Sequence, residues 1–179
     1  MINWFVLGLQ EKLYKRSLKK ILSDKSLNSD KEIRINPSKK ILILFDGTEN
    51  SDRQIVLGFA NDLKEAGKNV KLLSFINTKG ELMDFGMAVY NNSSINWYGF
   101  PKKHILELLE SQQFDILLNL NVSDKNHLHI LAIKAKADFK VSLPTKYQND
   151  FTLIINAKEK KDLKKILDEI NKYLSKLTI

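Results

Sequence analysis

Residues 40–76 read KILILFDGTENSDRQIVLGFANDLKEAGKNVKLLSFI, and this stretch decides the fold. It opens on residues 41–45, a continuous apolar run typical of a strand that is buried on both faces of a parallel sheet. Residues 70–76 form a second apolar run, and the segment between the two has helical periodicity. This strand–helix–strand unit predicts two parallel strands joined by a right-handed crossover.

The helix of this unit is expected to run from residue 51 or 52 to about residue 66. Ser51 or Asp52 is its expected N-terminal cap, and Gly67 is expected to end it. The side chains expected on its buried face are Ile55, Val56, Phe59, Ala60 and Leu63.

Strands and helices continue to alternate beyond this unit. Residues 77–101 are polar and contain glycine, proline and several aromatic residues, so we expect them to be irregular. The alternation predicts an α/β fold with a Rossmann-like open, mostly parallel five-stranded sheet sandwiched by helices. The further strands are expected at residues 114–120, 139–143 and 151–155, and the further helices at residues 102–112, 125–137 and 158–177.

An amphipathic helix over residues 3–22 is predicted to precede this domain. Residues 1–36 are therefore expected to be a basic helix and linker, and residues 37–179 the α/β domain. The sequence does not decide whether the helix packs on the domain or projects from it. Its basic arc is formed by Lys12, Lys15, Arg16, Lys19 and Lys20, and its apolar stripe by Leu7, Leu13, Tyr14, Leu18 and Ile21.

Positive charge is concentrated at the start of the chain. The 179 residues carry a formal net charge of +8. Residues 1–40 hold ten Lys and Arg against four Asp and Glu, whereas residues 41–179 hold nineteen against seventeen. Such asymmetry points to an anionic partner for the N-terminal helix. A lysine-rich face that only keeps the protein soluble is the alternative.

Two anionic partners fit the predicted helix. Structured RNA or a ribosome-type complex is favoured, because the five basic side chains of the arc would contact phosphates without reading sequence. An acidic membrane surface is the second partner, with Trp4, Phe5, Leu7 and Leu9 entering the interface. A cytoplasmic protein is expected, in the second case at the inner membrane, because no cysteine is present and no signal-peptide pattern opens the chain.

The ends of two predicted strands carry polar side chains. Asp46 and Thr48 follow the first strand, and Asn119 and Asn121 stand at the end of the strand at residues 114–120. Ligands of doubly wound sheets bind at such strand ends, so these four residues are candidates for binding a small-molecule ligand. Ordinary turns and helix caps are the alternative. Carboxylates at residues 46, 49 and 52 and the single glycine argue against a phosphate loop or a dinucleotide fingerprint.

An aromatic loop is the most unusual local composition. Trp97, Tyr98 and Phe100 lie close to Gly99 and Pro101. Exposed aromatic rings in a loop can stack on bases or contact a protein partner. The alternative, which we favour, is that Trp97 and Phe100 plug the edge of the core.

No catalytic, metal or cofactor motif is recognised. His127 and His129 would point about 200° apart on a helix, so they are not expected to share a metal. No nucleophile elbow is present, and no catalytic residue is assigned. We therefore favour a binding module without a cofactor. The alternative is an enzyme-like domain that binds a small molecule or a nucleotide sugar at the strand-end residues.

Several stretches together resemble a flavobacteria-type bacterial family of unknown function. They are residues 11–15 (EKLYK), 96–99 (NWYG), 114–119 (FDILLN) and 135–141 (AKADFKV). Residues 114–143 also resemble the N-terminal Rossmann-like half of heptosyltransferase-type glycosyltransferases. The first resemblance implies a fold and no activity. The second would imply binding of a nucleotide sugar, but the half that performs this in such enzymes has no counterpart here.

Overall fold

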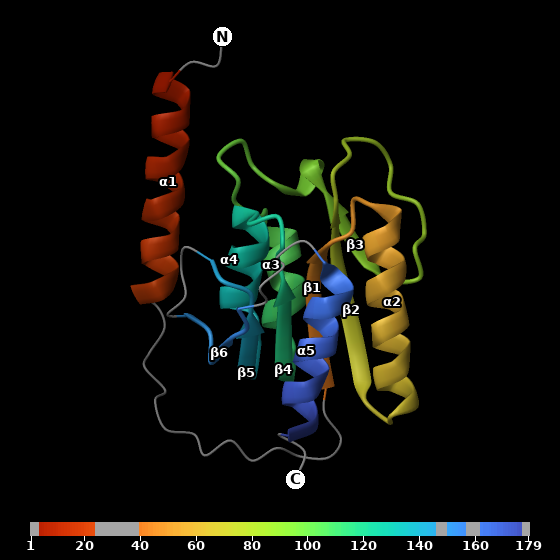
Figure 1. Cartoon of the computed structure of the whole chain (residues 1–179). Coiled ribbons are helices and arrows are strands. Elements are labelled where there is room, and N and C mark those ends of the chain that lie inside the picture. Colours follow the sequence, from red (N-terminus) through yellow and green to blue (C-terminus); the bar gives the residue numbers. More distant parts are fainter. Residues whose placement is uncertain (1–3, 24–39, 146–149, 157–161, 177–179) are drawn as a thin grey trace.

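A computed structural model describes residues 4–23, 40–145, 150–156 and 162–176 of the chain (Figure 1). The described residues form a parallel β-sheet with helices on both faces. The helices are α1 (Trp4–Ser23), α2 (Asn50–Glu65), α3 (Lys103–Glu110), α4 (Asn126–Lys134) and α5 (Leu163–Lys176). The strands are β1 (Lys40–Asp46), β2 (Asn69–Ile76), β3 (Ala88–Asn91), β4 (Gln113–Leu120), β5 (Lys136–Ser142) and β6 (Leu153–Ile154).

The sheet is six-stranded, and every strand pair in it is parallel. Its order is β3-β2-β1-β4-β5-β6, which is the Rossmann strand order. From β1 the chain builds outward to β2 and β3, and it then crosses back to place β4 on the other side of β1. The order therefore reverses between β1 and β4. This confirms the predicted α/β class and its Rossmann-like parallel sheet.

The predicted number of strands was wrong. The sixth strand is β3, which lies inside the segment expected to be irregular. It has only four residues, and it pairs on one side, with β2. Only Tyr90 and Asn91 of its residues are buried. A short edge strand with so few buried positions does not need the continuous apolar run that marks a strand buried on both faces.

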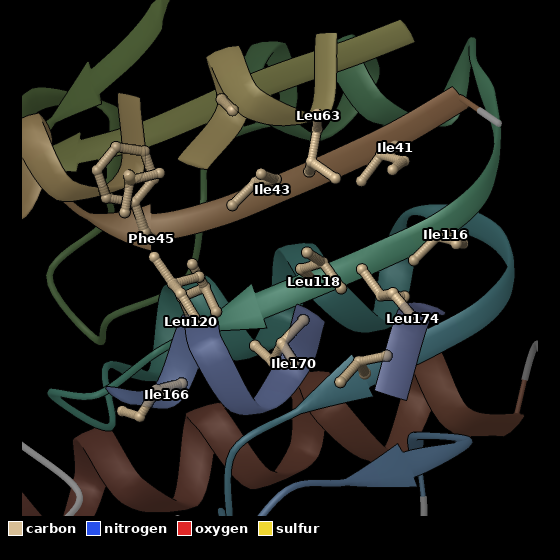
Figure 2. Close-up of a cluster of buried hydrophobic side chains, with 14 of the residues drawn as sticks. Ile41, Ile43, Phe45, Leu63, Ile116, Leu118, Leu120, Ile166, Ile170 and Leu174 are labelled. Atoms are coloured by element: carbon tan, nitrogen blue, oxygen red, sulfur yellow. The ribbon is translucent and has the colours of Figure 1, made fainter. Parts of the chain in front are cut away.

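Strand β1 lies at the centre of the core, and this position explains its continuous apolar sequence. Ile41, Ile43 and Phe45 face one layer, packing with α2 and α5 (Figure 2). Leu42 and Leu44 face the other layer, packing with α3 and α4. Side chains alternate between the faces of a strand, so a strand covered on both faces needs apolar residues at every position.

Several expected element ends are corrected by the structure. Helix α2 begins at Asn50, and Glu49 is its N-cap without a side-chain hydrogen bond, so the Ser51 or Asp52 cap was wrong. Helix α4 ends at Lys134 rather than at residue 137, because β5 already begins at Lys136. The last strand shortens to β6, and the predicted helix start at residue 158 lies outside the described residues.

Gly67 ends helix α2 as predicted. Its φ is +78°, and its N–H donates to the Lys64 carbonyl. This left-handed conformation is one that glycine adopts without the steric penalty of a Cβ. The buried face of α2 holds Val56, Ala60 and Leu63, with Ile55 and Phe59 half-buried beside them.

Helix α1 packs on the domain along part of its predicted apolar stripe. Tyr14 and Leu18 are buried in a cluster with Ile130 and Ile133 of α4. In Figure 1 the helix stands beside α4, at the outer side of that layer. The structure thus answers what the sequence left open. The predicted linker after the helix and the side chains of Leu7 and Ile21 lie outside the described part of the chain.

Candidate functional site

The carboxylate of Asp46 lies at the end of β1 and is held by two loops. Thr48 donates to Asp46 Oδ1 from its hydroxyl at 2.6 Å and from its backbone N–H at 3.1 Å. Ser123 Oγ donates to Asp46 Oδ2 at 2.9 Å, and Lys125 Nζ lies 3.4 Å from the same oxygen. Asp46 therefore joins the loop after β1 to the loop after β4.

Hydrogen bonding keeps Asp46 ionised although it is largely buried. Burial by itself would raise the pKa of this carboxyl. The hydrogen bonds from Thr48 and Ser123, together with the charge of Lys125, outweigh burial and lower the pKa below its usual value. The end of β1 therefore carries a fixed negative charge at neutral pH.

The loop after β1 is shaped by Gly47 and Arg53. A Cβ at residue 47 would collide with Ser74 Oγ and would lie 2.9 Å from Arg53 Cγ, so a larger residue would force these side chains to shift. Arg53 donates to the carbonyl oxygens of Gly47 and Thr48, the latter at 2.9 Å. The guanidinium is thus used to hold the loop.

A cleft of about 400 Å³ opens at the same edge of the sheet. It lies at the carboxyl ends of β1 and β4, where the strand order reverses, and the start of α5 closes one side. Ligand sites of open α/β sheets occur at this position. Its lining residues are Phe45, Asp46, Thr48, Glu49, Asp52, Asn77, Leu120, Val122, Ser123, Lys125 and Leu163.

A buried tyrosine–histidine pair also lies at this end of the sheet. Tyr90 Oη and His127 Nδ1 share a hydrogen bond at 2.8 Å, and the ring of Phe75 lies 4.4 Å from that of His127. Burial, assisted by the charge of Lys125, lowers the pKa of His127 to about 4. Burial and the charge of Asp46 raise the pKa of Tyr90. Both groups are therefore neutral at physiological pH.

The two asparagines are not among the side chains that line the cleft. Asn119 is buried, and its Nδ2 donates to Ser142 Oγ at 3.0 Å. The side chain of Asn121 bonds twice to the backbone of Lys125, at 2.9 and 2.8 Å, and forms the turn before α4. Asp46 and Thr48 do line the cleft. The structure thus brings together only two of the four strand-end candidates.

Lys125 and Ser123 were not predicted as site residues. Their positions after the β4 segment could have suggested them, since parallel strands end at the same edge of a sheet. The missing information was that β4 lies next to β1. Strand adjacency of this kind comes from the crossover and is not written in local sequence.

The basic arc of α1 faces outward. All five of its cationic side chains are exposed, and Lys15 forms an ion pair with Glu11 at 2.8 Å. The opposite side of the helix carries the buried Tyr14 and Leu18. These five side chains, Lys12, Lys15, Arg16, Lys19 and Lys20, are called the basic face below.

The aromatic loop divides its side chains between the core and the surface. Phe100 is half-buried and packs against the cluster that holds α1. Trp97 is 57% exposed, so it does not plug the core, and this part of the favoured interpretation was wrong. Its ring lies edge-on to that of Tyr98, with centroids 5.5 Å apart. Gln10 of α1 donates to the Trp97 carbonyl at 2.9 Å, so the loop lies against the basic helix.

The histidines lie in separate surroundings. His127 contacts Tyr90, whereas His129 lies 3.9 Å from Asp150 and packs near Phe151. Within the described ranges no three potential ligand side chains gather in a way that could hold a metal ion. None of the described helices combines the length and the apolarity needed to cross a bilayer.

Fold and site together define a parallel α/β protein with Rossmann strand order, a strand-end cleft and an outward basic helix. Residues 10–177 match the model of a family of unknown function, DUF6913. The match covers most of the chain, so the protein belongs to this family. No curated protein and no solved structure matches the chain, and no homologue supports the resemblance to heptosyltransferases.

Proposed function

We propose that this protein is a binding module that docks on structured RNA, free or within a ribosome-type complex, through the basic face of α1. The observation that carries the proposal is the division of this helix into two sides. Tyr14 and Leu18 are buried against α4, while every cation of the basic face is exposed. The domain thus presents a fixed row of positive charges to solvent.

Anchoring makes such a row effective. A helix that is already packed on a domain does not lose orientational freedom again when it binds, so less of the binding energy is spent on ordering. Up to five phosphate contacts are available, if each basic side chain reaches one. Counterion release then predicts a salt slope between about −3.5, the value for single strands, and about −4.5, the value for a duplex. Affinity should therefore fall roughly a hundred- to five-hundredfold between 50 and 200 mM salt.

RNA is favoured over an acidic membrane because part of the apolar stripe of α1 is buried against the domain. A helix lying in a membrane interface inserts its apolar side chains among the lipids. Here Tyr14 and Leu18 are already in contact with Ile130 and Ile133. Leu9, which was expected to enter a membrane interface, is exposed and remains available for it. Inserting Tyr14 and Leu18 as well would require α1 to leave the domain, whereas binding phosphates requires no rearrangement.

The aromatic loop adds an exposed ring next to α1. Trp97 is exposed, and its backbone is tied to α1 through Gln10. An exposed indole can stack on an unpaired base, which is worth about 1–3 kcal/mol. We therefore favour RNA with unpaired nucleotides, such as a hairpin loop, over a continuous duplex.

The test measures binding of a fluorescent RNA hairpin to the full chain by anisotropy, at 50 and 200 mM salt. A variant with Lys12→Gln, Arg16→Gln, Lys19→Gln and Lys20→Gln should lose binding at least tenfold at low salt. The matched control changes four exposed lysines elsewhere and removes the same charge: Lys64→Gln, Lys79→Gln, Lys136→Gln and Lys164→Gln. The control should bind nearly as well as the parent chain.

Two results would overturn the proposal. One is an equal loss in both variants, which would show that bulk charge and not the basic face attracts RNA. The other is no hairpin binding at low salt. A parallel experiment with vesicles containing acidic lipid distinguishes the alternative, since binding to vesicles without binding to RNA would replace RNA by a membrane.

A further inference from the structure

The cleft between β1 and β4 is independent of the basic face and has its own chemical character. Its floor is apolar: Phe45, Leu120 and Leu163 are buried there, and Val122 adds a partly exposed side chain at the edge. About 400 Å³ is within the usual range for small-molecule sites. An apolar floor of this size suits a hydrocarbon or aromatic body of one ring.

Polar groups gather on one side of the cleft. Asp46 already has its charge balanced by Lys125. Glu49 and Asp52 also line the cleft, and no described residue forms an ion pair with either of them. Burial and the neighbouring carboxylates Asp46 and Glu49 raise the pKa of Asp52. The carboxylates therefore repel one another, and a cation placed among them would relieve the repulsion.

The same arrangement disfavours anions. Arg53, the arginine nearest to the loop, uses its guanidinium on the carbonyls of Gly47 and Thr48 and on Asn50 Oδ1. Lys125 Nζ is engaged with Asp46 and lies 5.3 Å from the centre of the Phe75 ring. A phosphate entering the cleft would meet Glu49 and Asp52 without a free cation among the described lining residues.

Perturbed titratable groups are concentrated here as well. Asp46, Asp52, Tyr90 and His127 each have a shifted pKa, and these four groups belong to this end of the sheet. Such concentration is typical of functional sites. These shifts support the choice of this cleft as a ligand site, which already rests on its volume, on its position at the reversal of strand order and on its lining residues.

We infer that this cleft is a binding site for a small organic cation, an ammonium or guanidinium group carried on an apolar body. The apolar body lies on Phe45, Leu120 and Leu163, and the cationic group lies between Glu49 and Asp52 at the start of α2. Thr48 and Asn77 also line the cleft. The inference does not depend on the proposed RNA binding, which uses the basic face of α1 and none of the residues that line the cleft.

The experiment uses three probes of one shape that differ in charge: 2-phenylethylamine, 2-phenylethanol and phenylacetate. Each is titrated into the isotopically labelled full chain, and backbone amide shifts are followed by NMR. We expect saturable shifts with the amine, confined to residues 46–52 and 120–125, with a millimolar or lower dissociation constant. The alcohol should bind more weakly, and phenylacetate should cause no saturable shift at these amides.

A double substitution tests whether Glu49 and Asp52 bind the cationic group. Glu49→Gln with Asp52→Asn should weaken amine binding roughly three- to tenfold, since each removes one exposed ionic contact. The matched control is Asp62→Asn with Glu65→Gln, two exposed carboxylates at the other end of α2, and it should leave binding unchanged. Thermal unfolding of both variants verifies that the domain remains folded.

Four outcomes would overturn the inference. Phenylacetate could bind as well as the amine, the amine could fail to saturate, or its shifts could map away from the cleft. An unaltered affinity in the Glu49→Gln and Asp52→Asn variant would also reject it. None of these results bears on the hairpin experiment, so the two proposals fail separately.

Discussion

Lys125 Nζ lies 3.4 Å from Asp46 Oδ2, and this ion pair joins the ends of β4 and β1. The two residues are brought together by the parallel pairing of those strands, in which Phe45 lies opposite Leu120. Their side chains are largely buried, at 17% exposure for Asp46 and 29% for Lys125. The pair therefore fixes the loops that form the walls of the cleft.

Asp46→Asn should destabilise the domain by about 1–3 kcal/mol, because it leaves Lys125 without its counter-charge and weakens the bonds from Thr48 and Ser123. Urea unfolding at pH 7 measures the loss. Asp62→Asn, an exposed carboxylate on α2, should change stability by less than about 0.5 kcal/mol. Equal effects of the two substitutions would contradict a structural role for the ion pair.

The free energy of unfolding should decrease as the pH is lowered from about 6.5 to about 4, because His127 becomes protonated in the unfolded chain before it does in the folded one. The pKa of His127 is about 4 in the folded protein, below its usual value of 6.5, so the unfolded state binds more protons in this window. The loss should reach about 2–3 kcal/mol. Chemical unfolding across this pH range tests it. His104→Gln, which changes an exposed histidine, should keep the pH dependence, whereas His127→Gln should reduce it.

The folded pKa of Asp46 adds a second step at lower pH. It lies below the usual value, so the stabilisation is present above the unfolded pKa and disappears as the pH falls through the folded one. Asp46→Asn should therefore flatten the stability curve below about pH 4 while the His127 step remains. An unchanged acid limb in Asp46→Asn would show that this carboxyl is not held as described.

Leu18→Ala should cost about 2–4 kcal/mol, because Leu18 is only 4% exposed and packs with Ile130 and Ile133 of α4. The substitution should also increase hydrogen exchange and proteolysis in residues 8–20. Ser17→Ala, on the same helix but only half-buried, serves as the control. Unchanged protection of α1 in Leu18→Ala would mean that the helix is not anchored through this cluster.

Lys140→Met should destabilise the domain by about 1–3 kcal/mol. The buried ammonium of Lys140 donates to the carbonyls of Ala132 and Ile133, each at 2.8 Å, and so satisfies the last turn of α4. Methionine keeps the apolar stem but leaves the carbonyls without this donor. Thermal unfolding tests it against Lys136→Met, which changes an exposed lysine on the same strand and should have little effect.

Trp97→Ala should weaken binding of the RNA hairpin by about five- to a hundredfold and leave a fully paired duplex unaffected, because stacking needs an unpaired base. Met83→Ala, which truncates another exposed apolar side chain, is the control. The comparison uses the anisotropy experiment with two RNAs. A similar loss on hairpin and duplex would assign Trp97 a role other than stacking.

Much of the fold could be predicted because its signals are local. The unbroken apolar run of β1 follows from burial on both faces, and the helical spacing of Val56, Ala60 and Leu63 follows from the single buried face of α2. Gly67 was predictable for a similarly local reason, its positive φ. Strand β3 was missed because an edge strand of four residues with one neighbour carries no such pattern.

The candidate sites divide in the same way. The sequence by itself determined the α/β class, the charge asymmetry and the basic face, since helical periodicity alone places those cations on one side of α1. Only the tertiary structure decided that Tyr14 and Leu18 hold α1 on α4, that Trp97 is exposed, and that Lys125 reaches Asp46. These facts depend on which elements become neighbours. Adjacency is fixed by packing across the whole chain, and no local stretch of sequence contains it.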